Sequence, residues 1–83
     1  MAKLTKQQMD YYESGIPDDL TFTTADDAKV DNARQDRISV MAQSDVSGRK
    51  KKRTQADFNN PSEYKLYQLC VYDAALRAYK GID

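Results

Sequence analysis

Histidine and tryptophan are absent from this 83-residue chain, and cysteine occurs once, at Cys70. A single cysteine excludes an internal disulfide. One thiol without histidine also cannot build a structural zinc site, which takes four ligands drawn mostly from these two residue types. The lack of histidine removes the usual general base near neutral pH as well. We therefore expect no catalytic, cofactor-binding or metal-binding residues and no enzymatic activity.

Few other side chains are candidates for chemistry. Cys70 lies in the apolar run Leu69-Cys70-Val71, where a thiol stays protonated and behaves as a small buried hydrophobe. The pairs Asp18-Asp19 and Asp26-Asp27 lack the alternating oxygen ligands of a calcium loop. We interpret Cys70 as a packing residue and the aspartate pairs as turn and helix-cap residues.

Long apolar runs are also missing. The first residues lack the apolar stretch of a signal peptide, and no segment approaches a membrane span. The expected location is the cytoplasm or a virion, without secretion or a membrane partner. A chain this short buries only about 60–65% of its unfolded surface, so its stability is marginal alone. Residues 1–83 are thus predicted to form one small domain or an extended subunit within a larger protein assembly or homo-oligomer.

The sequence contains clear signals for a first, short helix over Lys6–Glu13. Thr5 and Gln8 have the spacing of a capping box, in which each side chain accepts the other residue's backbone N–H. Leu4 and Met9 are placed as a hydrophobic staple across this cap. Gly15 suits a left-handed end after the helix. Eight residues do not stay helical alone, so this helix is expected to dock on another element.

A second, polar helix is predicted over Ala25–Gln43, with Thr23 or Thr24 as its cap. Its apolar stripe is thin and consists of Val30, Ala33, Val40 and Met41, with Ile38 to one side. Such a stripe is typical of a solvated helix lying on a larger surface. Residues 44–57 show no apolar period and are interpreted as a basic linker.

The third helix is predicted to begin after Asn60, with Pro61 at its first position, and to end at Lys80 before Gly81. Glu63 is expected to reach back to the cap, and Ile82 to pack on Leu76. The predicted fold is therefore mostly α: a short N-terminal, a polar middle and an apolar C-terminal helix in an open arrangement.

Apolar residues surround the third helix, whereas a surface helix normally carries one apolar stripe. One half of it is rich in tyrosine, a residue enriched at interfaces. The predicted partner-binding residues on this half are Tyr64, Tyr67, Val71, Ala75 and Ala78. The alternative is that this half is the core of the domain itself. In that case a partner surface would lie around Leu66, Leu69 and Leu76.

The net charge of zero hides an asymmetry. Residues 1–48 carry nine acids against five bases, and residues 49–83 carry eight bases against four acids. The strongest signal is the run of five bases Arg49, Lys50, Lys51, Lys52 and Arg53. This run can neutralise nucleic-acid phosphates, dock on an acidic protein surface, or form a solvated loop. It has no interleaved aromatic residues for base stacking, so reading of single strands is not supported.

The stretch Ser47-Gly48-Arg49-Lys50, followed by further bases, resembles a short motif in small virion proteins of T7-like tailed bacteriophages. The resemblance implies a viral structural or assembly role and assigns no functional residue. We expect a non-enzymatic structural or interaction protein that packs its C-terminal helix on a larger assembly such as a phage virion. The alternatives are a small phage regulator that inhibits a host enzyme and a nucleic-acid-binding accessory protein.

Overall fold

The computed structural model describes residues 3–81, which contain helices and connecting segments but no strand. The elements are α1 (Lys6–Glu13), α2 (Thr24–Ala28), α3 (Asn32–Ser47), the 3-10 turn η1 (Gln55–Asp57) and α4 (Pro61–Lys80). The expectation of a mostly α fold is therefore confirmed.

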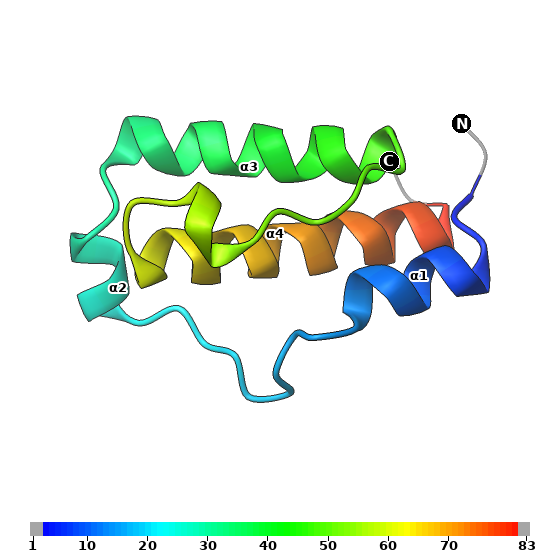
Figure 1. Ribbon diagram of the computed structural model, residues 1–83, viewed down its shortest axis with the longest axis horizontal. Coiled ribbons are helices and arrows are strands. Elements are labelled where there is room, and N and C mark those ends of the chain that lie inside the picture. Colours follow the sequence, from blue (N-terminus) through cyan, green and yellow to red (C-terminus); the bar gives the residue numbers. More distant parts are fainter. Residues whose placement is uncertain (1–2, 82–83) are drawn as a thin grey trace.

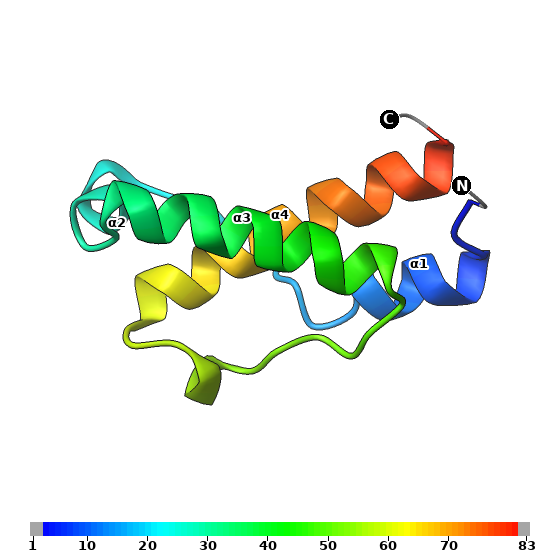
Figure 2. The ribbon, with the colours of Figure 1, turned by 90° about the horizontal axis from the view of Figure 1, so that it is seen from above.

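Helix α4 is the central element of the fold, and the other helices pack on it (Figure 1). Helix α3 makes the most extensive contact and runs in the same direction as α4, crossing it at an angle (Figure 2). Helix α1 runs the opposite way beside the C-terminal half of α4. The radius of gyration is 12.5 Å, close to the roughly 12 Å of a compact chain of this length. The open arrangement expected from the sequence is thus replaced by a compact one.

Helix α1 has the predicted bounds and cap. The Thr5 backbone N–H donates to Gln8 Oε1 at 2.9 Å, and the Gln8 backbone N–H donates to Thr5 Oγ1 at 3.2 Å. The staple residues Leu4 and Met9 are both buried. Gly15 has a left-handed φ of 79°, as expected for the residue that ends the helix. The Leu4 N–H also donates to the Ala78 carbonyl at 3.3 Å, which ties α1 to the end of α4.

The single helix predicted over Ala25–Gln43 is wrong, because the chain breaks after Ala28 and restarts at Asn32. Thr23 caps α2 as expected, but Asp31 provides a second cap by accepting the Ala33 N–H at 3.2 Å. The break lets the side chain of Val30 enter the core, where it is 3% exposed. Because of the Asp31 cap and the burial of Val30, two helices separated by a break are favoured over one continuous helix.

Helix α3 also extends four residues beyond the predicted end, to Ser47. Its buried face consists of Ile38, Ala42 and Val46, which follow each other at intervals of four residues. Two members of the predicted stripe, Ala33 and Val40, are instead exposed. The stripe was misplaced because Val46, two turns after Ile38, lay outside the predicted helix, so that Ile38 and Ala42 were not recognised as the start of a buried face.

Helix α4 follows its prediction closely. Asn60 Oδ1 accepts the Glu63 N–H at 3.0 Å, Pro61 is the first helical residue, and Gly81 ends the helix with φ 74°. The Glu63 side chain departs from its prediction, because it pairs with Arg34 Nε at 3.1 Å instead of reaching back to the cap. The expected contact of Ile82 lies outside the described residues.

The core lies between α4 and the helices around it. Its buried apolar residues are Leu4, Met9, Tyr12, Val30, Ile38, Ala42, Val46, Phe58, Tyr67, Val71 and Ala75. Among the helices of residues 3–81, none combines the length and apolarity needed to cross a membrane.

Candidate interaction groove

The basic run lies in a segment that returns along the molecule from the end of α3 to the start of α4 (Figure 1). We call residues 48–54 the return segment. The Tyr12 hydroxyl, from α1, donates to the carbonyls of Lys50 at 2.8 Å and Asp45 at 3.2 Å. The Lys50 N–H donates in turn to the Asp45 carbonyl at 2.8 Å. The segment predicted as a linker is therefore held against α3 and α1 by its backbone.

A buried carboxylate fixes the far end of the return segment. Asp45 Oδ2 accepts from Arg53 Nε at 3.0 Å and from the Tyr67 hydroxyl at 2.7 Å. The Tyr67 oxygen also accepts the Arg53 backbone N–H at 3.1 Å. Burial, followed by the hydrogen bond to Asp45, raises the pKa of Tyr67 well above its usual range. The phenol thus stays protonated, and the Asp45 bond raises the pKa of Arg53 as well.

Two further bases of the run also have partners within the chain. Lys52 Nζ donates to the Ser14 carbonyl and lies 5.1 Å from the centre of the Tyr11 ring. Burial lowers the pKa of this ammonium. Arg49 has a left-handed φ of 55° and donates through Nη1 to the Ser47 carbonyl at 2.9 Å. The structure therefore divides the run, since Arg49, Lys52 and Arg53 bind the chain itself.

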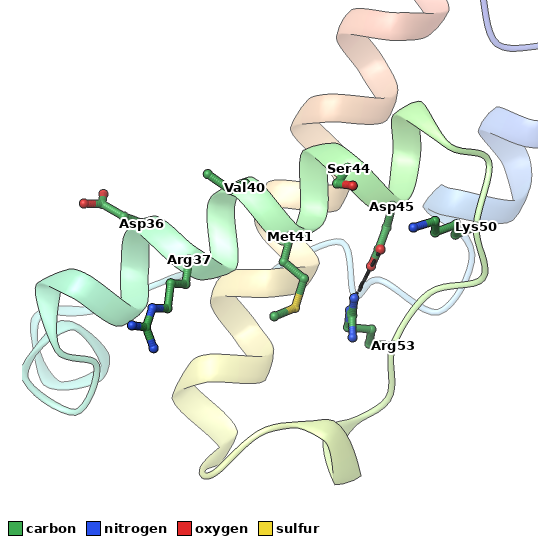
Figure 3. A pocket seen from close by; sticks show the side chains of 8 residues that line it. All are labelled: Asp36, Arg37, Val40, Met41, Ser44, Asp45, Lys50 and Arg53. Atoms are coloured by element: carbon green, nitrogen blue, oxygen red, sulfur yellow. Dashed lines mark hydrogen bonds and ion pairs between the residues drawn. The ribbon is translucent and has the colours of Figure 1, made fainter.

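The remaining two, Lys50 and Lys51, are exposed, and no acidic side chain within residues 3–81 pairs with either of them. Lys50 borders an open groove of about 470 Å³ between α3 and the return segment (Figure 3). The groove is lined by Asp36, Arg37, Val40, Met41, Ser44, Asp45, Lys50 and Arg53.

The groove is lined by two cations and two apolar side chains. Arg37 and Met41 point from α3 toward the side on which Arg53 lies, whereas Val40 points away from them, on the same side of α3 as Asp36 (Figure 3). Val40 is 65% exposed, which is the largest value among the exposed large hydrophobic residues. Asp45 is neutralised by Arg53, so Asp36 is the one acid of the lining that opposes the two cations. The groove can accept an acidic ligand with an apolar side chain.

The tyrosine half of α4 is not this groove, and its predicted role as a partner surface is corrected. Tyr67, Val71 and Ala75 are 1%, 0% and 0% exposed and pack within the chain's own core. Tyr64 and Ala78 are half-buried beside them. Phe58, which follows η1, covers this half with its ring centre 5.1 Å from that of Tyr67. The α3 and α1 helices thus supply the cover that the sequence alone did not reveal.

The opposite half of α4 is covered less completely. Leu66, Leu69 and Leu76 are half-buried, and Leu66 and Leu76 pack against the core. Cys70 is also half-buried, and burial raises the pKa of its thiol. A protonated thiol is a poor nucleophile.

A second buried carboxylate joins α2 to the start of α4. Asp26 accepts from the Thr23 backbone N–H at 3.0 Å, the Ser62 hydroxyl at 2.9 Å and Lys65 Nζ at 3.1 Å. The Thr23 backbone bond and then the Lys65 bond hold the pKa of Asp26 well below its usual range. All its bonds are to groups that position α2 and α4, and within residues 3–81 no cluster of side chains suits a metal ion.

Sequence reasoning missed the residues that make the groove. Val40 was assigned to the apolar stripe of the predicted second helix, and Asp45 was placed in the linker. The pairing of Asp45 with Arg53, eight residues later, follows no helical or strand period and leaves no local signal. One signal was available: Val40 does not share a helical face with Ile38, so one of the two had to point away from the core.

Comparisons of the chain with protein-family models, with curated proteins and with solved structures found no match. The function is therefore argued from the site.

Proposed function

We propose that this protein is a non-enzymatic interaction protein that binds an acidic, partly apolar protein surface in the groove between α3 and the return segment. The exposure of Val40 in the lining of a groove that Arg37 and Lys50 also line carries the proposal. Burying a valine side chain contributes roughly 1.5 kcal/mol, which this fold leaves unused. The two cations would give the contact its orientation and its preference for acids.

A protein surface is favoured over nucleic acid because of how the basic run is used. Binding along a phosphate backbone depends on several cations that each neutralise one phosphate. Three of the five bases instead bind within the chain, and no aromatic side chain lines the groove for stacking on bases. Val40 and Met41 also offer apolar area that a phosphate backbone does not use.

The larger role that we propose is that of a small structural or assembly protein, such as a minor component of a phage virion. Two observations support it: the resemblance of Ser47-Gly48-Arg49-Lys50 to the phage virion motif, and the lack of histidine and of a metal-ligand cluster within residues 3–81. The resembling motif forms the end of α3 and the start of the return segment, at one end of the groove.

A photo-crosslinking amino acid at Val40 tests the proposal in cells that produce the chain. We expect one defined protein adduct from Val40, and none from the same amino acid at exposed Gln7 on α1. The adduct should disappear when Lys50→Glu is added. Equal adducts from both positions would contradict the proposal. A duplex DNA adduct, or a DNA mobility shift lost in Lys50→Gln/Lys51→Gln, would favour the nucleic-acid alternative.

A further inference from the structure

The chain carries its own acidic segment with an exposed apolar residue, and this segment contacts the return segment where Lys52 Nζ donates to the Ser14 carbonyl. Residues 13–20 join the end of α1 to the segment before α2 and lie across α4 from α3 (Figures 1 and 2). Glu13, Asp18 and Asp19 are exposed, and no base within residues 3–81 pairs with them. Between them, Pro17 is exposed and Ile16 half-buried.

The side chains of residues 13–20 are complementary to the groove. The segment presents acids and an apolar pair, whereas the groove presents two cations, Arg37 and Lys50, and two apolar side chains. Arg37 and Ser44 are seven residues apart on α3, so the groove floor is about 10 Å long. Residues 13–20 are held in turns, with the Ile16 N–H donating to the Glu13 carbonyl at 3.3 Å and the Leu20 N–H to the Pro17 carbonyl at 3.2 Å, so Asp18 and Asp19 form the tip that meets this floor.

From this match we propose that the groove binds residues 13–20 of a second copy of this chain. The inference rests on the proposed function and names the acidic surface that the groove accepts. The absence of net charge favours this occupant, because two copies do not repel each other at long range. The contact lets Asp18 and Asp19 approach the exposed cations while Pro17 covers Val40.

The contact is heterologous, because the groove and residues 13–20 are different surfaces of each copy. A bound pair still offers one open groove, on one copy, and one open acidic segment, on the other. Such contacts build open chains or closed rings instead of stopping at a dimer. Because exposed ion pairs contribute little each, we expect a dissociation constant on the order of 10⁻⁴ M. Association should weaken strongly with salt.

Sedimentation velocity of the full chain tests this inference. The weight-average sedimentation coefficient should rise with concentration in low salt and return to the monomer value at about 1 M salt, where the Debye length is about 3 Å. Two charge reversals should each abolish the rise: Arg37→Glu/Lys50→Glu in the groove and Asp18→Lys/Asp19→Lys in the segment. An equimolar mixture of the two variants should restore association only as far as a 1:1 dimer, because each variant retains the half that the other has lost and the pair has no further intact half.

The variant Lys29→Glu/Lys80→Glu is the control for the effect of net charge. It changes the total charge as the groove variant does, but both positions lie outside the groove. This control should self-associate as the unaltered chain does, within about twofold. Circular dichroism confirms that each variant is folded. Asp36→Asn, which removes the opposing acid of the groove, should strengthen association about two- to threefold.

A monomeric unaltered chain at every concentration would overturn the inference. Unchanged association of the groove variant, or loss of association in the Lys29→Glu/Lys80→Glu control, would overturn it too. If the chain is monomeric while a crosslinker at Val40 captures another protein, the inference fails and the proposed function stands. If Val40 forms no adduct, the proposed function fails as well.

Discussion

Asp26 and Asp45 are both buried carboxylates that join distant segments, yet their neutral partners differ in size. Asp26 binds Ser62 and Lys65 where α2 meets α4, and Asp45 binds Tyr67 and Arg53 beneath the return segment. The cations are partly exposed in both cases, with 38% of the Lys65 side chain and 42% of the Arg53 side chain in solvent. The neutral partners are both buried, with Ser62 3% and Tyr67 1% exposed, but Tyr67 is also a large side chain of the core. A buried acid should therefore matter more where its neutral partner is itself part of the core.

The largest effect is expected at Tyr67, which belongs to the Asp45 network and to the core at once. Tyr67→Ala should lower the free energy of unfolding by about 4 kcal/mol, because it leaves a large cavity and removes the partner of Asp45. Urea unfolding followed by circular dichroism measures the loss. Lys65→Ala, on the same helix but in the Asp26 network, should cost about 1 kcal/mol or less. A Tyr67→Ala chain that unfolds like the unaltered one would show that this half of α4 is not core.

The next effect separates charge from packing at the Asp45 site. Asp45→Asn should cost about 3 kcal/mol, the lower end of the range for a broken buried ion pair, because Arg53 can reach solvent. Tyr67→Phe should cost about 1–2 kcal/mol. In a double-mutant cycle, the stability lost by the double variant should be smaller than the sum of the two single losses, since both substitutions remove the same 2.7 Å hydrogen bond. Strictly additive losses would mean that the Asp45–Tyr67 hydrogen bond itself adds nothing to the stability.

A smaller effect, confined to acid, is expected from Asp26. Its pKa is held below the usual range, first by the Thr23 backbone N–H and then by Lys65. A lowered folded pKa gives stability that is present above the unfolded value of about 3.9 and is lost as the pH falls through the folded value. The midpoint temperature of thermal unfolding should therefore fall more steeply between about pH 5 and pH 2 for the unaltered chain than for Asp26→Asn. Parallel curves would contradict this assignment.

The smallest expected effect concerns Arg49, whose left-handed backbone is costly for any residue with a Cβ. Arg49→Ala and Arg49→Gly both remove the side-chain bonds to the α3 carbonyls, but only glycine relieves the backbone. The glycine variant should be more stable than the alanine variant by about 1 kcal/mol. Paired thermal melts measure the difference. A more stable alanine variant would show that the strain is absent in solution.

Local signals predicted the ends of α1 and α4 well, because a cap depends on residues three or four positions apart. Thr5 with Gln8, and Asn60 with Glu63, bond as their spacing predicts. The break after Ala28 was missed for a physical reason. The sequence 25–43 reads as one helix until the gain from burying Val30 is counted, and that gain depends on the tertiary fold.

The candidate site could be predicted only in part, for the same reason. Five adjacent bases marked the return segment, but which of them remain available was decided by Ser14, Tyr11 and Asp45, which are remote in sequence or carry no periodic signal. The tyrosine half of α4 was recognised as an apolar surface. Its assignment to a partner was wrong, because the covering residues of α3 were attributed to the wrong helix face.

The bond from the Leu4 N–H to the Ala78 carbonyl has a consequence for how the chain folds. It places the two ends of the described residues side by side, so the first helix gains its packing only once α4 has been made. During synthesis, residues 3–13 would leave the ribosome without their docking surface and stay largely non-helical until α4 emerges. Although every regular element is a helix, the last step of folding closes a loop of more than seventy residues, a feature that slows folding relative to helical proteins built from neighbouring contacts.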